Sequence, residues 1–195
     1  MAGEDEKLRA DARANRDCIL DVARQAFAAD PQVSMSAIAR TAGVGAGTLY
    51  RHFSSREALV LAVFRREIDA LVILAPALLA EQPPLPAFRR WCDRLAQFGR
   101  AKHGVADAFH AALSEKDIRE TYWPVVGAIR QLITACEASG DIRPDTDPED
   151  FLLLLACLWR IPATSAGEVQ AERLLKVVFR GLGAEDMPSD DVPPS

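Results

Sequence analysis

The chain lacks most of the features that mark a membrane protein, a disulfide-stabilised domain or an enzyme. Its four cysteines are widely spaced, form no C-x-x-C pair and lie among apolar neighbours, which predicts buried, reduced thiols. The longest uncharged apolar run, Ala70 to Ala80, has eleven residues and contains a proline, whereas a membrane-spanning helix needs about 20. The charged N-terminus has no apolar signal segment. We therefore expect a soluble, cytoplasmic protein with no membrane partner.

The chain also lacks an excess of positive charge and any sustained strand pattern. Lys and Arg number 23 and Asp and Glu 28, so the formal net charge is −5, which excludes a uniformly basic nucleic-acid coat but not a local basic patch. The 49% hydrophobic content is enough for a real core. Apolar residues recur at i, i+3, i+4 and i+7 rather than alternating. The fold class predicted from these observations is all-α.

The helical patterns divide the 195-residue chain into two folded parts. A small domain of three helices is expected over 13–56, and a larger helical body over 57–183. The acidic, proline-rich residues 184–195 are expected to be disordered, and so is a charged N-terminal arm, 1–12. The apolar residues of 105–113 predict a short helix within the body.

A compact helix-turn-helix pattern lies between residues 34 and 56. Met35 and Ile38 give a short helix one apolar face, and Gly43 permits a left-handed turn. A second short helix then buries Leu49 and Phe53 at i, i+4. Helix, tight glycine turn and helix form the helix-turn-helix motif, whose second helix reads the major groove of DNA.

The outward face of the second helix carries residue types that suit DNA. Ala46 and Gly47 are small, so the backbone can enter the groove, and Thr48 can meet a base edge. Phosphate oxygens are the natural acceptors for the remaining polar side chains of this region, namely Tyr50, Arg51, His52 and Arg56. Residues 13–56 hold six arginines and three aspartates, a charge of +3, which leaves −8 for the rest of the chain. This asymmetry is typical of a protein that touches DNA with one end.

The segment I-A-R-T-A-G-V-G-A-G-T-L-Y-R-H-F, followed by S-S-R-E-A-L, resembles the DNA-binding domain of the TetR family of transcriptional regulators. The resemblance covers about Ala14 to Leu61. It implies that residues around Ser34 and Ser36 approach DNA together with the face described above. Gly45 stands where the family often has a capping serine. The region from Ala138 to Leu152 is similar to SbtR-type members, which implies an effector-binding body and a dimer interface made from the last two helices.

A two-fold homodimer is also predicted from the apolar pattern near the C-terminus. The segment from Phe151 to Trp159 is apolar all the way round, so a single helix face cannot accommodate it. A complementary stripe lies on a helix at 168–182. The expected dimer interface consists of Phe151, Leu155, Trp159, Ala171, Leu175, Val178 and Phe179. A dimer of this kind would bind a near-palindromic double-stranded operator.

Recurring aromatic residues in the body predict a cavity for a hydrophobic or aromatic small-molecule effector. The expected lining is Trp91, Phe98, Phe109, His110, Tyr122, Trp123 and Trp159, with His110 and Tyr122 as polar anchors. Core packing is the simplest interpretation of these aromatic residues, and two or three of them are expected to line the cavity.

No catalytic or cofactor motif accompanies these patterns. The run Gly43–Gly47 lacks the third glycine of a dinucleotide-binding loop and follows a helix rather than a strand. The histidine and cysteine spacings fit no zinc site. The prediction is therefore a regulator, usually a repressor, that is not an enzyme and has no cofactor. The alternative is a helical adaptor or small-molecule carrier that does not bind an operator.

Overall fold

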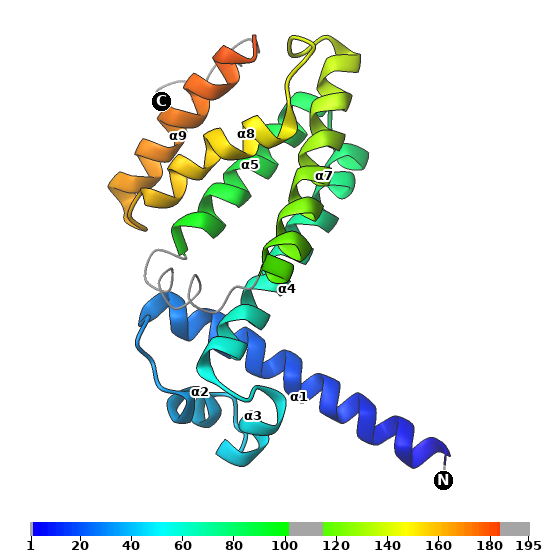
Figure 1. Ribbon diagram of the computed structural model, residues 1–195, viewed down its shortest axis with the longest axis vertical. Helices are drawn as coiled ribbons and strands as arrows, with labels where there is room; N and C mark the ends of the chain where they lie inside the picture. Colours follow the sequence, from blue (N-terminus) through cyan, green and yellow to red (C-terminus); the bar gives the residue numbers. More distant parts are fainter. Residues whose placement is uncertain (1, 102–114, 184–195) are drawn as a thin grey trace, which may run out of the picture. The chain divides into compact units, whose positions relative to one another are not determined.

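The computed structural model describes residues 2–101 and 115–183, and all regular secondary structure within these ranges is helical (Figure 1). The all-α prediction is confirmed. The expected helix at 105–113 and the tail at 184–195 lie outside the described residues. In chain order the helices are α1 (Ala2–Ala29), α2 (Met35–Thr41), α3 (Ala46–His52), α4 (Arg56–Glu81), α5 (Pro84–Ala101), α7 (Glu115–Ser139), α8 (Pro148–Leu155), the 3-10 helix η1 (Ala156–Arg160) and α9 (Ser165–Gly181).

The contacts divide the chain into two units, and helix α4 contributes to both. The first unit runs from the N-terminus to Ile68 and includes the start of α7 as far as Thr121, and the remaining residues form the second unit. The sequence predicted a boundary after residue 56. The boundary lies inside α4 instead, because Leu59 and Val60 in its first turns complete the core of the N-terminal unit.

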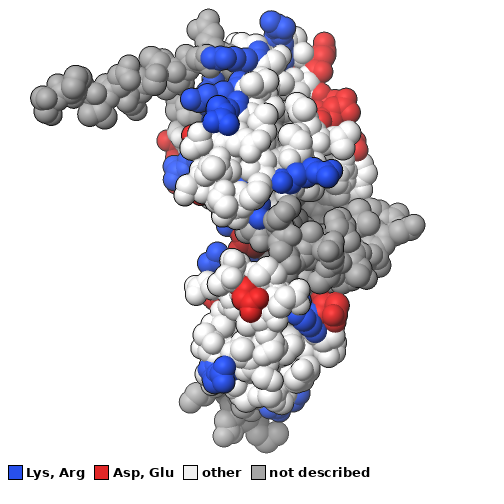
Figure 2. All heavy atoms as spheres, turned by 90° about the vertical axis from the view of Figure 1, so that its left-hand side faces the viewer, with Lys and Arg blue, Asp and Glu red and all other residues white. Residues whose placement is uncertain are grey.

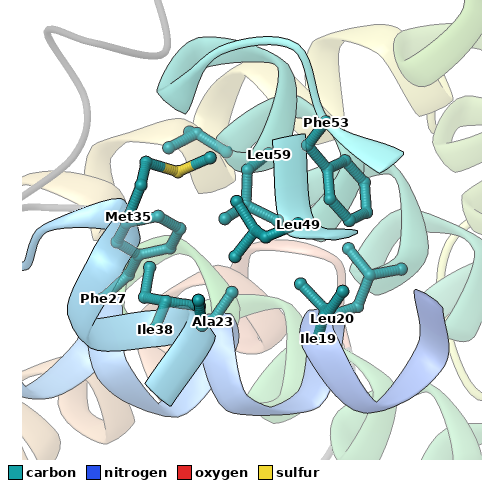
Figure 3. Close-up of a cluster of buried hydrophobic side chains, with 11 residues drawn as sticks. Ile19, Leu20, Ala23, Phe27, Met35, Ile38, Leu49, Phe53 and Leu59 are labelled. Carbon is teal, nitrogen blue, oxygen red and sulfur yellow. The ribbon is translucent and has the colours of Figure 1, made fainter. Parts of the chain in front are cut away.

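The core of the first unit gathers apolar side chains from the first four helices (Figure 3). Ile19 and Ala23 of α1, Ile38 of α2 and Leu49 of α3 are all almost completely buried. Gly43, with φ of +68°, makes the turn between α2 and α3 in the left-handed conformation that glycine adopts at low cost. The three-helix arrangement predicted from the spacing is therefore the one observed.

Helix α1 is longer than the sequence indicated. It begins at Ala2 and has 28 residues, so residues 2–12 of the predicted disordered arm are helical in the structure. The residues from Ala12 to Cys18 are exposed, and burial in the core begins at Ile19. Charged residues dominate the first half of α1, and such residues are good helix formers even where no apolar face is available.

The core of the second unit is organised around two buried aromatic side chains of α5. The ring of Phe88 lies 5.0 Å from that of Phe151 in α8 and 5.3 Å from that of Phe179 in α9. The indole Nε1 of Trp91 donates a hydrogen bond of 2.8 Å to the carbonyl oxygen of Leu71 in α4. Because this donor is satisfied, the largest side chain of the unit can be fully buried.

Two of the four cysteines contradict the prediction of buried thiols. Cys92 and Cys136 are buried, and burial raises the pKa of both thiols, that of Cys136 to about 12. Cys18 and Cys157 are exposed, because neighbouring apolar residues on a helix do not share its face. Among the described residues, no helix has both the length and the hydropathy needed to cross a membrane.

Candidate nucleic-acid interface

The outer face of helix α3 carries mostly small side chains at its N-terminal end, whereas its inner face is packed into the core. Leu49 is fully buried and Phe53, which ends the helix, is 3% exposed. Tyr50 is one of the large side chains on the surface, with half of its area exposed. The positions open to solvent on this helix and at its N-terminus are Gly45, Ala46, Gly47, Tyr50 and Arg51. The structure thus gives α3 the face that the sequence predicted.

Gly47 keeps the middle of this face flat. A Cβ atom built at Gly47 meets nothing within 4 Å, so the space in front of the backbone is open. Gly45 is the N-cap residue of α3 and makes no side-chain capping bond. The helix therefore begins without a side-chain hydroxyl cap, as expected from a glycine at this position.

Thr48 and Arg51 form a polar pair on the same helix. The guanidinium of Arg51 donates to the hydroxyl oxygen of Thr48 at 3.0 Å and to the carbonyl oxygen of Gly47 at 3.4 Å. Thr48 is half-buried and Arg51 exposed. The two side chains predicted to face DNA are thus coupled, and Arg51 fixes the direction of the threonine hydroxyl.

The two serines predicted near DNA differ in what their side chains do. The hydroxyl oxygen of Ser34 accepts a hydrogen bond from the backbone N–H of Ala37 at 3.2 Å, so it caps α2. Ser36 is exposed in the first turn of that helix. Only Ser36 has a side chain without a structural role in the described contacts. His52, also predicted, is half-buried, with its ring 6.3 Å from that of Phe53.

Arg56 occupies a position that the sequence did not indicate. Its guanidinium donates a hydrogen bond to the carbonyl oxygen of Pro31 and lies 5.0 Å from the centre of the Phe27 ring. The side chain is half-buried. Arg56 therefore ties the start of α4 to the loop between α1 and α2, and its predicted contact with phosphate stays a prediction.

Arg16 is a candidate that sequence reasoning counted but did not assign. Its guanidinium lies 5.3 Å from the centre of the Phe53 ring, at the C-terminal end of α3. The side chain is exposed, so a positive charge stands beside the end of the outer face. The contact between Arg16 and Phe53 joins α1 to the end of α3. The sequence around residue 16 does not predict such a long-range contact.

Most of the α8 and α9 residues predicted to form a dimer interface point into the core of their own chain. Five of the seven predicted interface residues are buried within the chain itself, with at most 5% of each exposed: Phe151, Leu155, Ala171, Leu175 and Phe179. Trp159 and Val178 are half-buried. The exposed apolar side chains of these helices are Leu153, Leu154, Val169 and Val177, between 51% and 74% exposed. The upper part of Figure 2 shows broad uncharged areas on the side where α8 and α9 lie.

Comparison with known proteins assigns both parts of the chain. Residues 19–63 match the model of bacterial regulatory proteins of the tetR family, and residues 83–184 match that of the SbtR-like transcriptional regulator C-terminal domain. The chain belongs to the TetR family of transcriptional regulators. The predicted resemblance, including its SbtR-type C-terminal region, is confirmed.

Solved structures of other TetR regulators cover nearly the whole chain. The regulator SCO0520 from Streptomyces coelicolor is 38% identical, with a TM-score of 0.75 over 86% of this chain and 97% of that one. A TetR regulator from Mycobacterium vanbaalenii is 32% identical, with a TM-score of 0.71 over 90% and 98%. The HTH-type regulator SAR0097 of Staphylococcus aureus is 36% identical over 89 residues, 44% of this chain and 47% of that protein. The matched region thus spans about half of that curated relative.

The five described residues among those predicted to line an effector cavity in this TetR-family body lie in different environments. Trp91 and Phe98 are core residues, and Trp123 is half exposed. The Tyr122 hydroxyl lies 3.5 Å from a carboxylate oxygen of Glu149, which raises the tyrosine pKa together with desolvation, the larger cause. Trp159 packs so closely on Gly99 that a Cβ there would overlap the indole. Phe109 and His110 lie outside the described residues.

The second unit contains instead a groove of about 410 Å³ between α5 and α9. None of the predicted ligand residues that the structure describes lines it. Charged side chains form its walls, and its floor is apolar. The lining residues are Arg89, Asp93, Ala96, Gln97, Arg100, Glu168, Ala171, Glu172, Leu175, Lys176 and Phe179.

Proposed function

We propose that this TetR-family regulator binds a double-stranded operator through the outer face of α3 and represses transcription until a small molecule releases it. The observation that carries the proposal is the contrast within α3, where Leu49 is fully buried while Gly47 and Tyr50 stand open to solvent. A helix of seven residues with a small, open centre can lie deep in a major groove.

The residues of this face divide into two roles. Thr48, whose hydroxyl oxygen accepts a hydrogen bond from Arg51, would contact base edges in the groove. In this role it would set the preference of the protein for particular DNA sequences. Tyr50, Arg16 and Ser36 are exposed donors at the margins of the face, and donors of this kind bind phosphate oxygens. The arginine excess of residues 13–56 adds an attraction that depends on salt.

We further propose that the protein acts as a two-fold homodimer through the exposed side of α8 and α9. The support is the set of exposed apolar side chains defined above, Leu153, Leu154, Val169 and Val177, to which we refer as the α8–α9 outer face. An apolar surface on both terminal helices suits a four-helix interface between two copies. Two heads related by a two-fold axis would bind half-sites spaced by one helical turn of DNA, about 34–36 Å, or a multiple of it.

The experiment that tests operator binding is selection of duplexes from a random DNA pool by the full-length protein. A regulator of this kind selects a near-palindromic sequence, and its affinity falls steeply as salt increases, with a slope in log–log form of about −0.9 for each neutralised phosphate. Selection of no sequence, with binding independent of salt, would favour the adaptor or carrier role instead.

A further inference from the structure

The α5–α9 groove is built from two facing rows of side chains. Helix α5 contributes one row at i, i+4, i+8 and i+11, and α9 contributes the other, running in the opposite direction. Arg100 near the end of α5 therefore faces Glu168 near the start of α9, at 3.7 Å. Arg89 lies over the ring of Phe179 at the other end, 5.1 Å from its centre. The groove thus has a fixed pairing at each end.

The floor between these ends is apolar and well supported. Leu175, Ala171 and Phe179 of α9 and Ala96 of α5 are buried, and all four line the groove. The volume of about 410 Å³ lies within the range of about 300–1,000 Å³ that small-molecule sites occupy. The groove therefore has the size and the apolar surface that a small organic ligand needs.

Two carboxylates line the groove between its two ends. Asp93 of α5 and Glu172 of α9 both line it, and the structure shows no ion pair of either with a described residue. Burial raises the pKa of Asp93, and the negative charge of Glu172 raises it further, outweighing the opposite effects of Arg89 and Arg100. The charged form of Asp93 is thus disfavoured, and a positive group placed between the two carboxylates would relieve it.

We propose that the α5–α9 groove binds a small organic cation with an apolar body, its charged group between Asp93 and Glu172 and its body on Leu175 and Phe179. Both arginines are engaged at the ends of the groove, by Glu168 and by the ring of Phe179. Lys176, the third basic residue of the lining, forms no ion pair with Asp93 or Glu172 in the structure, so both carboxylates are available to a cation. Binding at this site goes beyond operator recognition and stands without it. Its use as the effector site rests on the function proposed above.

The test uses three probes that share a phenylethyl-sized body and differ in charge. 2-Phenylethylamine is the cation, 2-phenylethanol the neutral analogue and phenylacetate the anion. Binding to the full-length protein without DNA is measured by titration calorimetry. We expect the amine to bind, and to bind at least tenfold more tightly than the other two.

Two variants locate the site. Asp93→Asn and Glu172→Gln should each weaken amine binding about tenfold or more, because each removes one of the two charges. Asp69→Asn, which removes an exposed carboxylate of α4, is the matched control and should leave binding unchanged. Circular dichroism checks that the variants are folded. Asp93 and Glu172 are both exposed, so each variant should fold, and either one provides the test if the other does not fold.

Three results would overturn the proposal: binding of none of the probes, tighter binding of phenylacetate than of the amine, or amine binding that both carboxylate variants leave intact. Because no DNA is present, each of these results would leave operator recognition untouched. Failure to select an operator would equally leave the groove proposal standing.

Discussion

Helix α3 and the α8–α9 pair both carry apolar side chains at helical spacing, yet the spacing predicts the buried face of one and not of the other. In α3 only Leu49, with Phe53 at its end, is large and apolar, so these two must point into the core. In α8 every position from Phe151 to Leu155 is apolar. Phe151 and Leu155 are buried and Leu153 is exposed, and the ring of Phe151 packs 5.0 Å from that of Phe88 in α5.

This difference shows when periodicity alone defines an interface. A helix with a single apolar stripe has one solution, because the stripe enters the core of its own chain. A helix that is apolar all round has two apolar faces, and only the face that packs best is buried in the core of its own chain. The other face is left for solvent or a partner. Five of the seven residues predicted to contact a partner are buried in the core of the chain itself.

The largest effect is expected from Leu155→Arg. Leu155 is 1% exposed, so the substitution creates an overpacked core and buries an unpaired charge. The free energy of unfolding should fall by more than about 4 kcal/mol, and chemical denaturation should show a largely unfolded chain. A folded monomer would mean that Leu155 faces a partner after all, as the sequence first indicated.

The second effect is expected from Leu153→Arg, two residues earlier on the other side of α8. Leu153 is 74% exposed, so the fold should remain intact. The charge should instead disrupt the α8–α9 outer face, and sedimentation should show a shift from dimer to monomer. Operator affinity should fall about tenfold or more, because a monomer engages only one half-site. A stable dimer with wild-type affinity would place the interface elsewhere.

A third, smaller effect separates two roles of Arg56. Arg56→Ala removes the bond to the Pro31 carbonyl and the stacking on Phe27, which should lower the free energy of unfolding by about 1–2 kcal/mol. If Arg56 only braces the loop, the salt dependence of operator binding stays the same. A slope reduced by about 0.9 for each subunit, or about 1.8 for the dimer, would show a phosphate contact in addition. Arg56→Lys, which keeps the charge but not the planar group, is the control.

The smallest of these effects is expected at the turn. Gly43 has a φ of +68° and open space around its Cβ position, so Gly43→Ala meets no clash and only pays for the left-handed backbone. The expected loss in the free energy of unfolding is about 1 kcal/mol. Thermal denaturation measures it. An unchanged melting temperature would show that the turn can relax to another conformation.

The features that the sequence could predict depend on residues that are close together in the chain. The turn at Gly43, the inward side chain of Leu49 and the outward face of α3 all follow from short-range spacing. The long-range contacts do not: Arg56 reaches Pro31 across 25 positions, and the indole of Trp159 packs against Gly99. The aromatic residues of the body were ambiguous for the same reason, since composition does not show whether flat side chains surround a space or fill it.

The central claim is that the outer face of α3 meets DNA, and Gly47→Leu tests it most directly. A side chain at Gly47 extends into open space, so the fold and melting temperature should be unchanged, while the leucine blocks entry of the helix into the groove. Gln25→Leu, at an exposed position of α1, is the control for an added apolar side chain. Fluorescence anisotropy with the selected operator should show at least tenfold weaker binding for Gly47→Leu and wild-type binding for Gln25→Leu. Undiminished binding by a folded Gly47→Leu dimer would contradict the account.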